Sequence, residues 1–193
     1  MIIKKIIFSI ILVAILMVSC KKSEVLTEEK KQEYITKGKD IAQSSFKALS
    51  GKLTEQMKAG GPKQAIPFCN VEAMPLTDSL SKEYNVSIKR TSDKFRNPKN
   101  EPTQRELEVI TNYKDQKSKG AFLEPIVEES ADKIVHFYAP ILASNKCLAC
   151  HGKLEETLKV QTDSIIKSLY PNDLATGYGD EELRGIWSIT FNK

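Results

Sequence analysis

The chain has 193 residues, of which 40% are apolar and 28% charged, so it is long enough for one domain with a real core. Its formal net charge at neutral pH is +4, and no basic stripe interleaved with aromatic residues runs through the sequence. We therefore expect no nucleic-acid partner. The chain contains four cysteines, few enough to be considered one by one.

The first residues have the layout of an export signal. Two lysines precede an apolar run over residues 6–18, which is short for a membrane span, and Cys20 follows that run. This resembles a bacterial lipoprotein signal, in which cleavage leaves Cys20 as the lipidated N-terminus, although Met17 stands where such signals usually carry leucine. The alternatives are an ordinary signal peptide with a chance cysteine, and an uncleaved anchor. Residues 1–19 are therefore predicted to be a signal peptide and not part of the folded domain.

The expected location follows from this signal. Its removal lowers the formal net charge from +4 to +2. Residues 20–32 are charged and lack large apolar clusters, so they are predicted to tether a domain over residues 33–193 to the lipid. We expect the protein in the cell envelope, on the periplasmic side. Lys21, where sorting signals for the inner membrane carry aspartate, favours the outer membrane by resemblance to those rules.

The first half of the domain is predicted to be helical. A long helix fits residues 33–59, and the Gly-Gly-Pro sequence over residues 60–62 ends it. A second helical stretch covers residues 63–73, Met74-Pro75 interrupts it, and a third helix is predicted over residues 76–84. Four apolar side chains of the first helix recur at helical spacing and are expected to face the core: Phe46, Leu49, Leu53 and Met57.

The second half mixes helices with runs of β-branched and aromatic residues. Thr103 and Glu106 have the spacing of a capping box, and the helix that they open runs to about residue 119 with Leu107 facing inward. Pro125 makes the strand that contains it an edge strand. The predicted strands are 86–90, 121–129, 133–142 and 184–191, and a further helix covers 155–169. Helices mixed with antiparallel strands indicate an α+β fold.

Cys147, Cys150 and His151 have the C-x-x-C-H spacing of a covalent haem c attachment site. Two thiols separated by two residues can each form a thioether with one vinyl group of the same porphyrin, and the next residue then brings its imidazole under the iron. A disulfide, half of a zinc site and a thioredoxin-type pair are the alternatives. Zinc would require a second ligand pair and thioredoxin chemistry a βαβ unit, and the sequence indicates neither. One covalently bound haem c is therefore predicted, with His151 as the proximal iron ligand.

Cys69 is the cysteine that neither lipid nor haem attachment accounts for. It could be a buried apolar residue, a partner in an intermolecular disulfide, or the distal ligand of the iron. His136, Met57 and Met74 are rival distal ligands, and an iron without a distal protein ligand is a further alternative. A lone histidine in an apolar strand is more often a hydrogen-bonded core residue, whereas Met74 would give the common His/Met pair.

Five blocks of sequence occur in a characteristic order. They are AIPFCNVEA (65–73), RNPKNEP (96–102), YAPI (138–141), CLACHG (147–152) and LRGIWSI (183–189). Together they resemble the cyanobacterial-type single-haem c protein family with a PAS-like fold, a domain also found as the extracytoplasmic part of some histidine kinases. The resemblance spans residues 34–191. No output domain follows Lys193, which argues against direct signalling by this chain.

The resemblance implies a PAS-like antiparallel sheet flanked by helices, preceded by a long helix. It also implies that His151 and Cys69 hold the iron. Arg90, Arg96 and Arg184 are candidates to pair with the haem propionates because arginine binds carboxylates through two hydrogen bonds, the alternative being that they are ordinary surface residues.

Three functions are considered. The first is a lipid-anchored, single-haem c-type cytochrome that senses redox state or a diatomic gas, or passes electrons to a redox or signalling partner. A thiolate ligand favours ferric iron, and a six-coordinate iron leaves no site for substrate, so we expect no enzymatic activity. The second is a plain periplasmic electron carrier with His/Met ligation. The third is a small haem peroxidase, which would need His136 as its acid–base group.

Overall fold

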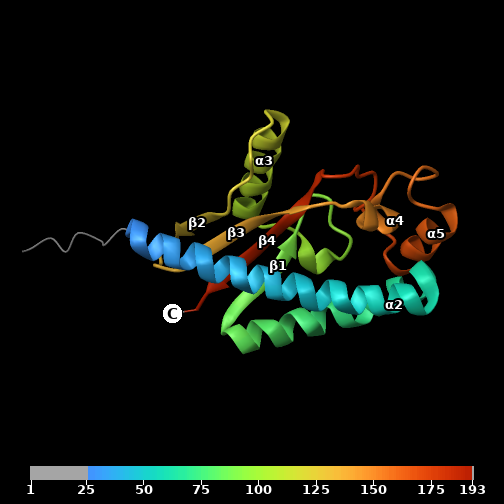
Figure 1. The fold of residues 1–193 in the computed structure, drawn as a ribbon, viewed down its shortest axis with the longest axis horizontal. Helices are drawn as coiled ribbons and strands as arrows, with labels where there is room; N and C mark the ends of the chain where they lie inside the picture. The colour runs from blue at the N-terminus through green and yellow to red at the C-terminus, as the bar shows by residue number, and fades with distance from the viewer. Residues whose placement is uncertain (1–25, 193) are drawn as a thin grey trace, which may run out of the picture.

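The computed structural model describes residues 26–192 (Figure 1). The predicted signal peptide, Cys20 and the first part of the predicted tether lie outside the described residues. The first described helix, α2 (Glu28–Tyr84), begins five residues before the predicted start at residue 33. The Thr27 hydroxyl accepts a hydrogen bond from the backbone of Lys30, and Glu28 and Glu29 place negative charge at the helix N-terminus. Both features stabilise a helix start, and the pattern of apolar residues alone does not report them.

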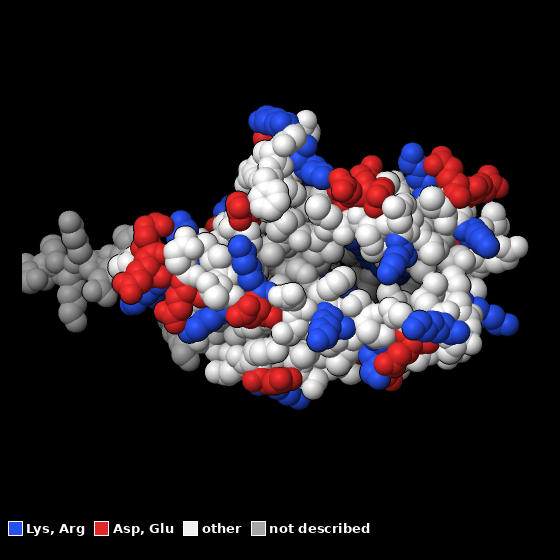
Figure 2. Space-filling view, in the orientation of Figure 1, with Lys and Arg blue, Asp and Glu red and all other residues white. Residues whose placement is uncertain are grey.

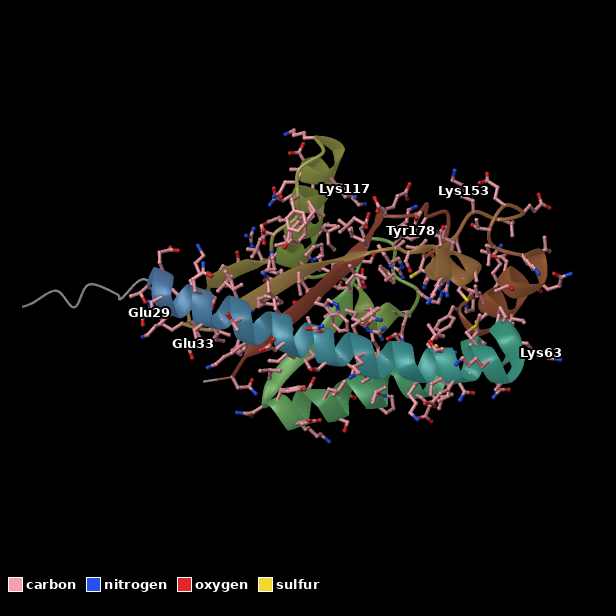
Figure 3. All side chains as sticks on the ribbon, in the orientation of Figure 1. Glu29, Glu33, Lys63, Lys117, Lys153 and Tyr178 are labelled. Atoms are coloured by element: carbon pink, nitrogen blue, oxygen red, sulfur yellow. The ribbon has the colours of Figure 1, made fainter. Side chains whose placement is uncertain are left out.

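Helix α2 consists of two limbs, residues 28–59 and 62–84, which run in opposite directions side by side (Figure 1). The sequence predicts that the first helix ends at residues 60–62, and the chain reverses there at Gly60 and Gly61. Gly61 has a φ of 63°, in the left-handed region that favours glycine. Lys63, labelled in Figure 3, marks the beginning of the returning limb at one end of the molecule. The reversal lays the returning limb along the first limb.

The predicted break at Met74-Pro75 is wrong, because the returning limb is one continuous helix to Tyr84. Proline removes one helical hydrogen bond and leaves the carbonyl four residues earlier without its partner. Pro67 and Pro75 are exposed, and so are Lys63 and Val71, whose carbonyls lose their helical partners. Water can hydrate those carbonyls, so the two prolines are tolerated inside the helix.

Four antiparallel strands form one sheet in the order β1-β4-β3-β2. β2 follows directly after Pro125 and lies at one edge, as that proline predicts. The last strand of the chain is central, so it joins β1 to the β2–β3 hairpin. The bounds are Val86–Thr91 for β1, Ile126–Glu129 for β2, Val135–Leu142 for β3 and Leu183–Phe191 for β4.

Helices cover both faces of this sheet. Phe137 of β3 packs in a core with α2 residues, whereas its neighbour Tyr138 packs with α3 (Gln104–Ser118) on the opposite face. This follows from the alternation of side chains along a strand. The predicted capping box at the start of α3 is present. Leu107, predicted to face inward, is 37% exposed, because the buried stripe of α3 consists of Val109, Ile110 and Tyr113. The α+β class, with an antiparallel sheet flanked by helices and a long first helix, is confirmed.

Short elements surround the C-x-x-C-H segment. The 3-10 helix η2 (Asn145–Cys147) leads from β3 into the single turn α4 (Leu148–His151). Helix α5 (Val160–Leu169) begins five residues after the predicted start at residue 155, because Glu155 has a φ of 65° and three backbone N–H groups bond to the Lys153 carbonyl in a tight turn. A second 3-10 helix, η1, spans Pro98–Asn100. No helix among residues 26–192 is long and apolar enough to cross a membrane.

Candidate functional site

A cavity of about 320 Å³ lies between α2, the sheet and the α4 segment. Figure 2 shows the surface hollowed at this place, between α4 and the first limb of α2, with basic atoms beside the opening. The cavity brings together all the predicted site residues among residues 26–192: Cys69, Arg90, Arg96, Cys147, Cys150, His151 and Arg184.

The apolar face of the first limb lines this cavity. Phe46, Leu49, Leu53 and Met57 all line it, and the prediction that they face the core holds for Leu49, which packs against the core, but is wrong for Phe46 and Leu53. Phe46 is 58% exposed and Leu53 is 38% exposed, so neither is a core residue of the protein as it stands. Their helical spacing correctly indicated a shared apolar face, but periodicity cannot distinguish a face that packs against protein from one that lines a cavity.

Helix α4 presents the two thiols of the motif to the cavity. Cys147 ends η2, and its sulfur accepts a hydrogen bond from the Ser144 backbone at 3.4 Å. Cys150 lies one turn later and packs beside Ile66 and Tyr170. Cys69, Cys147 and Cys150 are all free thiols. Burial raises the pKa of the Cys150 thiol, so it is protonated at neutral pH.

The imidazole of His151 is held in one orientation. Its Nδ1 lies 2.7 Å from the carbonyl oxygen of Ala175. Because a carbonyl only accepts, Nδ1 carries the proton and Nε2 is left as the atom with a free lone pair. Burial lowers the pKa of His151 well below its usual range, and the cations of Arg184 and Arg96 act in the same direction. A neutral imidazole with Nε2 free is the form that binds a metal.

Cys69 reaches the same cavity from the returning limb of α2. Burial raises the pKa of its thiol, while the nearby cations of Arg90 and Arg96 oppose that effect. Met57 and Met74 also line the cavity. His136 does not line the cavity, and its ring lies within hydrogen-bond distance, 3.1 Å, of the Thr190 hydroxyl.

The three arginines have different partners. Arg96 binds both carboxylate oxygens of Asp173, at 3.0 and 3.1 Å. Arg184 donates from Nη1 to the Lys94 carbonyl, and its buried Nε has no hydrogen-bond partner within the described part of the chain. Arg90 is largely buried and lies over the Trp187 ring, with no acidic partner among residues 26–192. Burial lowers the pKa of Arg90 and of Arg184. Two largely buried cations therefore face the cavity without a carboxylate partner in the described part of the chain.

The loop between α5 and β4 contributes to the site and was not predicted from the sequence. Asp173 pairs with Arg96, and Ala175 accepts the hydrogen bond from His151. Gly177 and Tyr178 donate backbone hydrogen bonds to the carbonyls of Gly152 and His151. The two glycines of this loop were a signal only for a turn, and a backbone carbonyl such as that of Ala175 carries no side-chain signature.

Comparisons with known proteins agree with this architecture. No curated protein matches the chain. The crystal structure of the cyanobacterial heme-protein Tll0287 matches with a TM-score of 0.61 at 19% sequence identity, covering 86% of this chain and 97% of that chain. At this identity the likeness shows a shared fold. The family model described as Tll0287-like matches residues 21–192, nearly the whole sequence. The chain therefore belongs to the Tll0287-like family.

Proposed function

We propose that this protein is a lipid-anchored, single-haem c-type cytochrome of the cell envelope, which acts in redox or gas sensing or in electron transfer. One observation carries the proposal: the fold gathers the two thiols and the histidine of the C-x-x-C-H motif, an isolated cysteine and unpaired arginines around one cavity. These residues come from α2, β1, η2, α4 and β4, so the fold and not the local sequence assembles them. The heme-protein Tll0287, which has the same fold, supports the choice of cofactor.

The cavity suits a haem group in three respects. The apolar side chains of the first α2 limb suit the faces of a porphyrin. His151 presents Nε2 with its proton fixed on Nδ1, the state required of a proximal ligand. Arg90 and the partnerless Nε of Arg184 would pair with anionic groups, and haem carries two propionates. Leaving these cations unpaired in a buried site is costly, so their presence supports an anionic ligand.

Each residue then has a stated role. Cys147 and Cys150 would each add their S–H bond across one vinyl group, forming a carbon–sulfur bond while the proton goes to the neighbouring carbon. His151 and Cys69 would hold the iron, and Arg90 and Arg184 would pair with the propionates. The bound iron would supply a one-electron redox couple. Arg96, the third candidate for a propionate, has its guanidinium bound to Asp173.

The position of Cys69 supports sensing as one use of the site. This residue lies on the limb of α2 that follows the Gly60-Gly61 turn. Loss of the sulfur–iron bond on reduction, or on binding of NO or CO, would free that limb from the haem. A signalling partner could detect this change, whereas a plain electron carrier would keep both ligands in both redox states. The peroxidase alternative is disfavoured, because His136, the acid–base group that it would use, bonds to Thr190 and does not line the cavity.

The first test is covalent haem attachment. The full chain would be produced in a bacterium with a c-type maturation system, and haem would be sought on a denaturing gel and by intact mass. We expect one haem per chain, and a mature N-terminus at a diacylated Cys20 in the membrane fraction. A Cys147→Ser/Cys150→Ser variant is the matched control and should release haem under denaturing conditions. Absence of bound haem in the wild-type chain would refute the proposal.

The second test identifies the distal ligand. With Cys69 bound, the ferric protein should show a low-spin spectrum with a sulfur-to-iron charge-transfer band, which Cys69→Ala abolishes. Met74 also lines the cavity, so the His/Met carrier is the second candidate. In that case Met74→Ala would change the spectrum and Cys69→Ala would not. Addition of CO to the reduced protein then distinguishes the sensor, whose spectrum changes, from a carrier with two permanent ligands.

A further inference from the structure

We infer that Arg96 and Asp173 form a clamp that orients the imidazole of His151, and that both are positioning residues of the proximal ligand. This inference rests on the proposed haem function and deepens it. It concerns residues of the loop between α5 and β4 and of the segment after β1, which the C-x-x-C-H motif does not include. It also gives Arg96 a role other than the propionate contact predicted from the sequence.

Asp173 fixes the residue whose carbonyl accepts the hydrogen bond from the imidazole. Its side chain is only 3% exposed, and its Oδ1 accepts the backbone N–H of Ala175 at 3.0 Å. The carbonyl of the same residue, Ala175, accepts Nδ1 of His151 at 2.7 Å. The carboxylate therefore holds Ala175 on its N–H side while the imidazole bonds to its carbonyl side.

Arg96 joins the loop that contains Asp173 and Ala175 to the haem-attachment segment. Its Nε and Nη2 bind the two oxygens of Asp173, and Nη2 also donates to the carbonyl of Cys150 at 2.7 Å. A longer contact of 3.5 Å runs from Nη2 to the Ala175 carbonyl. Cys150 directly precedes His151. One guanidinium therefore holds both the backbone next to His151 and the loop whose carbonyl accepts the hydrogen bond from the imidazole. The guanidinium side chain is 14% exposed, which limits competition from water.

The loop has other attachments that do not depend on Asp173. The backbone N–H of Tyr178 donates to the carbonyl of His151 at 3.0 Å, and that of Gly177 donates to the carbonyl of Gly152 at 2.9 Å. A variant that lacks the carboxylate therefore keeps two backbone bonds between the loop and the α4 segment. We expect such a variant to fold and to accept haem, with the imidazole less firmly oriented.

Ligand orientation and the strength of the Nδ1–H bond set how strongly an imidazole donates to iron. The Ala175 carbonyl accepts this bond, and the Asp173 carboxylate restrains the same residue through its N–H. Without the carboxylate Ala175 is held less firmly, so the Nδ1–H bond and the donation from the imidazole weaken, and a nearby negative charge is removed as well. Both changes favour the ferrous state, so the midpoint potential should rise.

The test compares Asp173→Asn with wild type in the haem-loaded full chain. The matched control is Asp163→Asn, which removes a carboxylate of α5 that is likewise paired with a cation, Lys167, at 2.6 Å. We expect Asp173→Asn to shift the ferrous-to-ferric ratio at fixed potential by tenfold or more, which is 59 mV for a one-electron couple. The ferric electron paramagnetic resonance g-values should also change, because they depend on the orientation of the imidazole plane. The control should shift the ratio by less than twofold and leave the g-values unchanged.

A second variant keeps the inference testable if Asp173→Asn fails to fold. Arg96→Lys retains the charge but cannot bind Asp173 and the Cys150 carbonyl through one planar group, so it should change the g-values and shift the ratio less than Asp173→Asn. A haem-loaded Asp173→Asn or Arg96→Lys protein with wild-type potential and g-values would overturn the inference, even if its melting temperature fell. Failure of the proposed function is distinct, since the wild-type chain itself would then carry no haem.

Discussion

Replacement of Arg90 by methionine should change stability in opposite directions with and without haem. In the protein described here, the guanidinium is largely buried, lies 6.0 Å from the Trp187 ring centroid and has no acidic partner within the described residues. Methionine retains the length of the alkyl chain without the charge. In the unloaded protein the substitution therefore removes a cost, whereas in the loaded protein it removes a partner of a propionate or of the Cys69 sulfur.

The size of the effect follows from these contacts. A buried polar group without a hydrogen-bond partner costs about 1–3 kcal/mol, which is an upper bound for the partly buried Arg90, and the lost contact with Trp187 offsets about 0.5–1 kcal/mol of the gain. We expect the unloaded protein to gain about 1–2 kcal/mol, which raises the melting temperature of a chain of this size by about 2–8 °C. In the loaded protein, loss of a hydrogen bond between charged groups should cost about 1.5–3 kcal/mol.

Thermal unfolding followed by far-ultraviolet circular dichroism would measure both values. The unloaded protein would carry Cys147→Ser and Cys150→Ser and would have its non-covalent haem extracted, and the loaded protein would have its wild-type thiols. Arg105→Met is the control, because Arg105 is an exposed arginine that already pairs with Glu108 and Glu128. It should not stabilise either form. A change of the same sign for Arg90→Met in both forms would refute the idea that the cavity is built around an anionic ligand.

Three further predictions concern the scaffold. Gly152→Ala would place a Cβ 1.9 Å from the Thr157 hydroxyl oxygen, so urea unfolding should show a loss of about 1–3 kcal/mol, whereas Gly51→Ala, with nothing within 4 Å, should gain about 0.5–1 kcal/mol. Burial opposes ionisation of Glu106, but hydrogen bonds from Lys89, the Thr103 backbone and Ser188 outweigh burial and lower the pKa of Glu106 below its usual value of 4.5. The ionised carboxylate therefore stabilises the fold above pH 4.5, and this contribution is lost as the pH falls through the folded-state pKa. Glu106→Gln should flatten the decline of urea-unfolding free energy below about pH 4, and a slope as steep as that of wild type would contradict this assignment. Tyr113→Phe removes the hydroxyl that donates to the Glu124 carbonyl at 2.8 Å and should cost about 1–2 kcal/mol in the same assay, with an unchanged free energy as the contrary result.

The sequence predicted the elements whose signals are local. The capping box at Thr103, the end of the first helical limb at Gly60-Gly61 and the edge position of the strand after Pro125 each depend on neighbouring residues, and the structure contains all three. The break at Pro75 was predicted wrongly, because the cost of a helical proline depends on whether water reaches the carbonyl four residues earlier. That exposure is a tertiary property.

The residues of the site could be predicted from the sequence, but the hydrogen bonds between them could not. The C-x-x-C-H motif and the isolated Cys69 pointed to one centre, and the fold places them around one cavity. The role of Arg96 could not be found in this way, because its partner Asp173 lies far along the chain and nothing in the local sequence pairs the two. The prediction that Phe46 and Leu53 face the core is wrong for a similar reason, because a helix face that lines a cavity has the same hydrophobic periodicity as one that packs in the core.

The distance along the chain between Cys69 and His151 has a consequence for folding. About 80 residues separate them, including the whole of β1, α3, β2 and β3. An iron atom bound by both would close a loop of that length, as a disulfide does, and the entropy removed from the unfolded chain corresponds to about 4–5 kcal/mol in the chain-entropy model. His151 is next to the attachment thiols, so it would bind the iron as soon as the haem is attached. Cys69 would reach the iron only after α2 has docked on the sheet. The sulfur–iron bond would therefore be the last link to form and the first to be lost, and its absorption band would report whether the long helical hairpin is docked.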